Sequence, residues 1–185
     1  MAIGGNLMSD EELWERTAKA LYGGDFTLLD ELLTEHDASI VDLLEVNGWP
    51  QDEMNEAFAW ACFTGRTADA ETLLDKGVDP AKSDKTGLAG FHWAANRGNF
   101  ETVRMLIRRK APMEQLNMYG GSVLGQTLWS AVNEHRDAHA DVIEDLVGGG
   151  AALEPGTLEW WNQQAVPSTE TKARVADILS RSGVE

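Results

Sequence analysis

The chain has 185 residues, of which 43% are apolar and 25% are charged, the composition of a folded domain rather than of a disordered segment. Its formal charge of −16 argues against nucleic acid and anionic membranes as partners, because both must be met by cations. No apolar run approaches the roughly 18 residues of a membrane span, and residues 1–8 lack the features of a signal peptide. These properties predict an acidic cytoplasmic protein, in which the lone Cys62 cannot form an internal disulfide.

The first fifty residues are predicted to contain one helix pair. Residues 1–8 are expected to be a disordered extension, because Ser9-Asp10-Glu11-Glu12 is typical of a helix start. A first helix would end at Gly23-Gly24, and the second would bury the leucines at positions 28, 29, 32 and 33. Residues 34–52 are expected to form an unusually long linker to the next pair.

The middle of the chain repeats itself after 33 residues without a gap. Phe58-Ala59-Trp60-Ala61-Cys62-Phe63-Thr64-Gly65 aligns with Phe91-His92-Trp93-Ala94-Ala95-Asn96-Arg97-Gly98. In each unit a small-residue helix ends at a glycine suited to a left-handed C-cap, and a helix with one apolar face follows. One such pair cannot bury both of its faces, so neighbouring pairs must stack on it.

Two further helix pairs are predicted downstream. Ser122 is a suitable N-cap for a helix beginning at Val123, and its partner helix covers 141–147. About seven residues are inserted between these two helices, around 133–140. A final pair is expected at 157–164 and 168–180, where only one of the adjacent Trp160 and Trp161 can point inward.

These residues resemble the ankyrin repeat family. The family's pattern of Asp-x-x-Gly, a Thr-Pro-Leu-His helix start, paired alanines, glycine and a second helix is matched at Asp84, Gly87, Phe91, His92, Ala94, Ala95, Gly98, Glu101, Val103, Leu106, Ile107 and Ala111. The resemblance implies a single all-α domain, an ankyrin-type solenoid of about five helix pairs at 9–185. Its three ankyrin-like repeats would cover about 51–83, 84–116 and 117–153, between degenerate caps at 9–50 and 154–185.

The central unit departs from the family at its helix start. Ala89-Gly90 stands where Thr-Pro would be, and Lys110 replaces a glycine. The resemblance implies a structural role for His92, which bonds backbone groups of adjacent turns in this family. Because Ala89 has no hydroxyl group, one expected hydrogen-bond partner of His92 is missing.

The resemblance also implies where a partner would bind, because the family uses its hairpin tips and the exposed side of the first helix in each pair. The matching positions in this sequence are Asp52, Glu53, Asn55, Phe63, Thr64, Lys85, Thr86, Leu88, Asn96, Arg97, Met118, Tyr119, Gly121, Trp129 and Ser130. Among these, Phe63, Tyr119 and Trp129 are expected to be the energetic anchors. Trp60 and Trp93 occupy equivalent positions and either pack in the core or form an aromatic platform in the groove.

No residues predict catalysis or a cofactor. The sequence has no phosphate-binding loop, nucleophile elbow or zinc-type spacing. His135 and His139, followed by Asp141, are the metal-ligand candidates, but the two histidines lie in the predicted insertion without a third histidine nearby, so a solvated polar loop is expected instead.

Two functions from different classes remain open. The first is a protein-binding module, in its sharper form an immunity-type neutraliser of a basic toxin or enzyme. The eleven acidic and two basic residues of the first fifty positions suit a cationic partner. The alternative is a small-molecule binder or an enzyme using the tryptophan-lined groove.

Overall fold

The computed structural model describes residues 8–182, so the predicted extension lies, apart from Met8, outside the described residues. In this range the chain forms eleven helices. They are α1 (Asp10–Gly23), α2 (Phe26–Glu35), α3 (Ile40–Val46), α4 (Gln51–Thr64), α5 (Thr67–Asp75), α6 (Gly90–Arg97), α7 (Phe100–Arg108), α8 (Val123–Asn133), α9 (His139–Gly148), α10 (Thr157–Gln163) and α11 (Thr169–Arg181). Between residues 8 and 182, no helix has both the length and the hydropathy needed to cross a bilayer.

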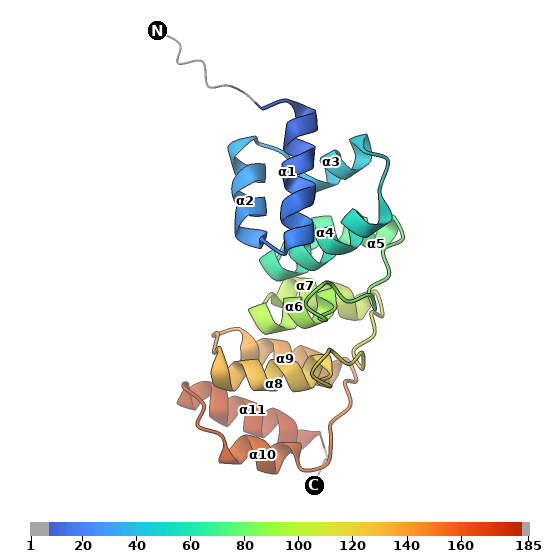
Figure 1. Cartoon of the computed structure of the whole chain (residues 1–185). Coiled ribbons are helices and arrows are strands. Elements are labelled where there is room, and N and C mark those ends of the chain that lie inside the picture. Colours follow the sequence, from blue (N-terminus) through green and yellow to red (C-terminus); the bar gives the residue numbers. More distant parts are fainter. Residues whose placement is uncertain (1–7, 183–185) are drawn as a thin grey trace.

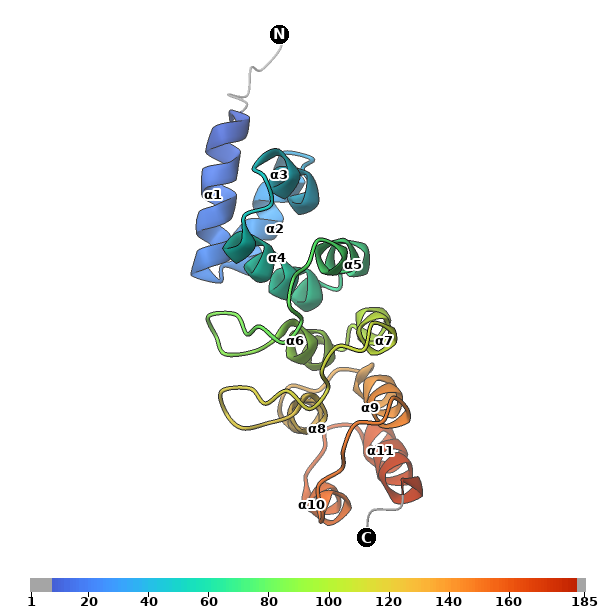
Figure 2. The ribbon, with the colours of Figure 1, turned by 90° about the vertical axis from the view of Figure 1, so that its right-hand side faces the viewer.

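The helix pairs stack into an elongated solenoid (Figure 1). Figure 2 shows α4, α6, α8 and α10 in one row, with α5, α7, α9 and α11 in a second row to its right. The loops that precede α6 and α8 project from the first row, side by side. The predicted all-α solenoid of five helix pairs is thereby confirmed.

The N-terminal cap differs from the prediction in one respect. The expected linker at residues 34–52 contains α3, which begins after Ser39, whose hydroxyl accepts hydrogen bonds from the backbone N–H groups of Val41 and Asp42. Ile40 and Leu44 of this helix are buried. Seven residues are too few to show a clear helical period, which is why the sequence pattern missed this element.

Helix ends elsewhere follow the predicted signals. Ser122 caps α8 by accepting from the Gly125 N–H at 3.2 Å, and Ser168 caps α11. Gly65 and Gly98 adopt positive φ values of 76° and 73°, the left-handed conformation predicted for them. The helix pairs therefore reverse direction at residues whose chemistry favours the turn.

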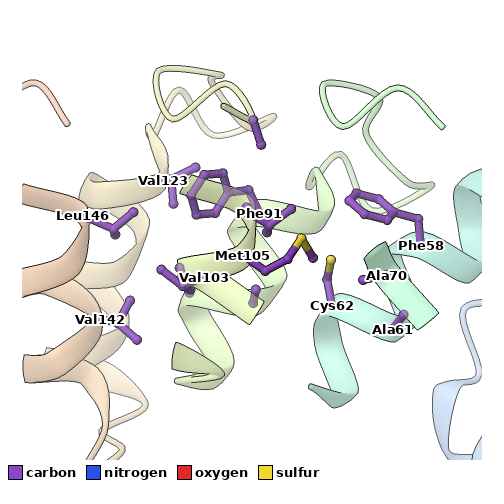
Figure 3. Packing of buried hydrophobic residues seen from close by; sticks show 14 of the residues in the cluster. Phe58, Ala61, Cys62, Ala70, Phe91, Val103, Met105, Val123, Val142 and Leu146 are labelled. Carbon is purple, nitrogen blue, oxygen red and sulfur yellow. The ribbon is translucent and has the colours of Figure 1, made fainter. Parts of the chain in front are cut away.

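One apolar core runs through the whole stack, and Figure 3 shows its centre. Phe58 of α4 and Phe91 of α6 lie in successive layers, with Cys62 and Met105 between them. At the C-terminal end Trp161 is fully buried and donates its indole N–H to the Lys172 carbonyl at 3.0 Å, whereas Trp160 is 39% exposed. The prediction that only one of these tryptophans points inward is confirmed.

Ion pairs connect the second-row helices to one another. The pairs are Arg109 with Asp75, Arg104 with Asp145, and Arg174 with Asp141. All six side chains are at least partly exposed, so each pair contributes little to stability. Their larger consequence is that these arginines are already matched by carboxylates within the chain.

Candidate binding groove

A groove of about 860 Å³ lies along α6 and α8, on the side where the hairpin loops project. Helix residues form its floor, and the tips of the two loops form its rim. It is lined by Thr86, Leu88, Trp93, Asn96, Arg97, Asn117, Tyr119, Gly120, Gly121, Gly125, Gln126, Trp129 and Glu134. The groove therefore combines aromatic rings with amides, one carboxylate and one guanidinium.

The groove floor contains a network of hydrogen bonds across the two repeats. The Asn96 side-chain amide donates to the Ser130 hydroxyl at 2.7 Å and to the Glu134 carboxylate at 3.2 Å. Within the second of these repeats, the Asn117 side-chain amide donates to the side-chain carbonyl of Gln126 at 2.9 Å. Asn96 and Ser130 are only 5% and 0% exposed, so the prediction that they face a partner directly is wrong. They bond each other instead and tie α6 to α8.

Trp93 forms one wall of the groove. Its indole N–H donates to Asp84 Oδ2 at 2.6 Å, and Asp84 Oδ1 accepts from the Thr86 backbone N–H at 2.8 Å. The same carboxylate thus orients the ring and shapes the hairpin tip. Trp60, at the equivalent position of α4, is fully buried. Of this pair, only Trp93 therefore lines the groove, and Trp60 packs in the core.

The rim carries exposed apolar side chains. Met118, Tyr119 and Trp129 are 65%, 78% and 47% exposed. The Met118 backbone N–H donates to the Gly87 carbonyl at 3.1 Å, which joins the two hairpin tips. Two of the three predicted anchors, Tyr119 and Trp129, are therefore accessible on a braced rim.

The third predicted anchor, Phe63, belongs to an aromatic cluster and is partly buried. Its ring lies 5.1 Å from Phe26 and 5.2 Å from Trp93, measured between centroids. The Arg97 guanidinium lies over the same ring, 4.4 Å from its centroid. Phe63 thus connects the N-terminal pair to the repeats, and the prediction of an exposed anchor at this position is wrong.

The remaining predicted contact residues divide by burial. Asn55 and Leu88 are buried, which contradicts their predicted exposure at the hairpin tips. Asp52, Thr64, Lys85 and Thr86 are exposed and Glu53 is partly exposed. Two of them contact nearby groups of the chain itself, because Asp52 pairs with Lys82 and the Lys85 ammonium lies 4.6 Å from the Tyr22 ring centroid.

His135 and His139 both bond to protein atoms. His139 is fully buried, and its Nε2–H donates to the Asn96 carbonyl at the end of α6 at 2.8 Å. Its Nδ1 accepts from the Arg136 backbone N–H at 3.2 Å, and His135 Nε2 lies 3.0 Å from the Thr171 hydroxyl. Within residues 8–182, no three potential metal ligands converge. The segment between α8 and α9 is solvated at Glu134 and Asp137, as predicted, whereas His139, the first residue of α9, is buried.

A protein-family model described as "Ankyrin repeats (many copies)" matches residues 58–107. This segment of the chain consists of ankyrin repeats. The match extends from α4 to α7, across the two units that align after 33 residues. Ankyrin repeats generally mediate protein–protein interaction and are typically not enzymes.

His92 lies in the matched segment, beside the altered helix start of α6. The ring is fully buried, and its Nε2–H donates to the Gly121 carbonyl at 3.2 Å, which fastens the second hairpin loop to α6. Its Nδ1 has no hydrogen-bond partner within the described structure. Ala89, the N-cap of α6, likewise provides no side-chain cap. A hydroxyl group at position 89, where the family pattern has threonine, would supply the missing cap and is expected to reach His92 Nδ1.

Ala89→Thr is accordingly expected to raise the free energy of unfolding by about 1 kcal/mol, by capping α6 and donating to His92 Nδ1. Urea unfolding followed by circular dichroism measures the change. Ala89→Val provides the matched control, since it adds similar volume without a hydroxyl group. Equal stabilities of the threonine and valine variants would contradict the hydrogen-bonding argument.

Stability is expected to fall when the pH drops below about 6.5. Burial lowers the pKa of both His92 and His139 from the ordinary value of 6.5, although their backbone acceptors oppose this in part. Above pH 6.5 both rings are neutral in either state; below it the unfolded chain binds protons that the folded protein does not. Below pH 6.5, each ring should therefore lower the free energy of unfolding by up to about 1.4 kcal/mol per pH unit.

Urea unfolding at pH 7.5, 6.5 and 5.5 measures this loss. His139→Gln should weaken the pH dependence, because glutamine does not titrate. An unchanged slope in that variant would contradict the assignment of the proton linkage to His139.

Proposed function

We propose that this protein binds a protein partner in the groove along α6 and α8, with Tyr119 and Trp129 as the main anchors. The observation that carries the proposal is the exposure of these two aromatic side chains beside an open groove. Tyrosine and tryptophan dominate binding energy at protein interfaces because they bury a large rigid surface at little entropic cost. The hydrogen-bonded floor adds rigidity, so little ordering is left to the binding step.

The partner in this proposal is basic, and a toxin or enzyme neutralised by being covered is one form of it. Charge supports this choice. Of the acidic residues described in α1, α2 and α3, only Asp30 forms an ion pair, with Arg66 at 2.8 Å. Three arginines of the second row, Arg104, Arg109 and Arg174, are in contrast matched by carboxylates. The N-terminal cap is thus the part of the surface best suited to attract a cationic protein.

The test is affinity capture from extracts of the source cell, with bound proteins identified by mass spectrometry. The native chain should retain a partner that the double variant Tyr119→Ser/Trp129→Ser does not retain. Phe100→Ser is the matched control, because Phe100 is an exposed aromatic residue on the second row. A partner retained equally by the double variant would overturn the groove proposal.

Ionic strength tests the charge of the partner separately. Affinity for the captured protein should fall as salt rises towards about 0.5 M, where exposed charges are screened over a few ångströms. Affinity that does not change over this range would contradict a basic partner while leaving the groove intact.

A further inference from the structure

Three tryptophans lie on successive first-row helices: Trp93 on α6, Trp129 on α8 and Trp160 on α10. Trp93 and Trp129 both line the groove of about 860 Å³. Beyond Trp129, a second hollow of about 320 Å³ is lined by Leu128, Pro155 and Trp160. Trp129 therefore stands as a ridge between two hollows, with another indole bordering each of them.

The repeat of the solenoid sets the spacing of the two hollows. Packed helices lie about 8–10 Å apart, so the hollow along α6 and α8 and the hollow along α8 and α10 are separated by about that interval. Trp129, the seventh residue of α8, lies one helical turn further along than Trp93 and Trp160, each the fourth residue of its helix. Gly125 lines both hollows and adds no side chain between them. The result is a continuous strip of aromatic ridges and hollows along the first row.

The indole N–H groups of this strip differ in their bonding. That of Trp93 is held by Asp84. Those of Trp129 and Trp160 make no hydrogen bond to any described residue, and both side chains are exposed. Two hydrogen-bond donors therefore remain available beside the apolar hollows.

We infer that the segment of the partner lying in this strip is proline-rich and adopts the polyproline II conformation, an inference that rests on the proposed function. A polyproline II helix rises about 3.1 Å per residue with three residues per turn, so the same face returns every 9 Å or so. That period matches the spacing of stacked helices. Every third residue of the segment can then enter successive hollows.

Hydrogen bonding distinguishes this conformation from the alternatives. Polyproline II has no internal hydrogen bonds, so its carbonyls can accept from the indole groups of Trp129 and Trp160. The carbonyls of an α-helix are already paired within the helix. A β-strand returns the same face every two residues, at about 6.6 Å, which does not match the spacing of the hollows.

The charge of the protein predicts one further property of the partner's segment. Glu134 lies in the larger hollow, and the chain carries a net charge of −16. Among the residues lining this hollow the cation is Arg97, and its guanidinium is stacked on Phe63. The segment should therefore carry lysine or arginine beside its prolines.

The experiment measures fluorescence anisotropy of a labelled twelve-residue peptide, with proline at every third position and two lysines, titrated with the full chain. Two analogues have alanine for each proline or glutamate for each lysine. The parent peptide should bind at least about tenfold more tightly than either analogue. Equal affinity of the proline and alanine peptides would overturn the inference.

Two variants of the protein locate the site. Gly125→Leu should reduce affinity at least about tenfold by filling both hollows. It introduces no strain, because a Cβ at Gly125 meets only the Ser122 hydroxyl at 3.5 Å and leucine favours a helix. Trp129→Phe keeps an aromatic ridge but removes the donor, and should weaken binding roughly threefold to tenfold, consistent with one hydrogen bond. Phe100→Leu is the control on the second row.

The outcomes separate this inference from the proposed function. If Gly125→Leu leaves peptide affinity unchanged, the strip is not the site of the peptide. If the captured partner depends on Tyr119 and Trp129 but the proline-rich peptide neither binds nor competes with it, the inference fails and the groove proposal stands. If capture is independent of Tyr119 and Trp129, both fail.

Discussion

Replacing His139 with alanine should lower the free energy of unfolding by about 3 kcal/mol. The buried imidazole donates to the Asn96 carbonyl at 2.8 Å and accepts from the Arg136 N–H. Alanine leaves both backbone groups without these partners and opens a cavity between α6 and α9. Asn99 performs the same task one repeat earlier, where its amide donates to the carbonyls of Cys62 and Phe63 at 2.8 and 3.0 Å.

The measurement is urea unfolding at pH 7.5, compared across His139→Ala, His139→Gln and His135→Ala. Glutamine can place an amide donor near the position of Nε2, so it should recover part of the loss. His135 is only partly buried, and its removal should cost less than 1.5 kcal/mol or so. If His139→Ala and His135→Ala lower the free energy of unfolding by equally small amounts, His139 does not hold the repeats together.

The second large effect is expected at Gly90. Gly90→Pro restores the residue typical of ankyrin repeats, yet it should destabilise this protein by about 3 kcal/mol. A Cβ at this position would lie 2.6 Å from Phe58 Cε1 and 3.0 Å from Cys62 Sγ. Both neighbours are fully packed in the core, so they cannot move away without loss of contact elsewhere. A proline at position 90, as in the family pattern, therefore cannot fit beside the Phe58 ring of this chain.

A double-mutant cycle with Phe58→Leu tests this explanation. Gly90→Pro should be less harmful when Phe58→Leu has made room, so the two changes together should cost less than their sum. Strict additivity would show that the ring of Phe58 is not what excludes proline. A further contrast comes from the adjacent position, where Ala89→Thr is expected to stabilise.

The helix pairs could be predicted from the sequence because their signals are local. Apolar periodicity, Ser122 and Ser168 as N-caps, and Gly65 and Gly98 as C-caps each act within a few residues of the chain. Helix α3 was missed because its two buried residues provide too short a pattern. The 33-residue shift, in contrast, compared two full units and revealed the fold.

The groove could be predicted only in part, since burial depends on contacts between repeats. Trp60 and Trp93 share one register, but α1 packs across α4 and has no counterpart over α6, so only Trp60 is fully enclosed. Asn96 and Ser130 lie 34 positions apart, and no local pattern shows that they bond to each other. The roles of His139 and Phe63 likewise depend on partners from other repeats. Such pairs cannot be identified from charge, composition or the family pattern.

Site-specific photo-cross-linking tests the central claim, binding of a protein partner in the groove, most directly. A benzoylphenylalanine at position 119, on the exposed rim, should cross-link the captured partner, whereas the same group at position 100, on the second row, should not. Prior addition of saturating partner to the unmodified chain should remove the product at position 119 by competition. Cross-linking at position 100 without any at position 119 would contradict the account, because it would place the partner on the opposite row of helices.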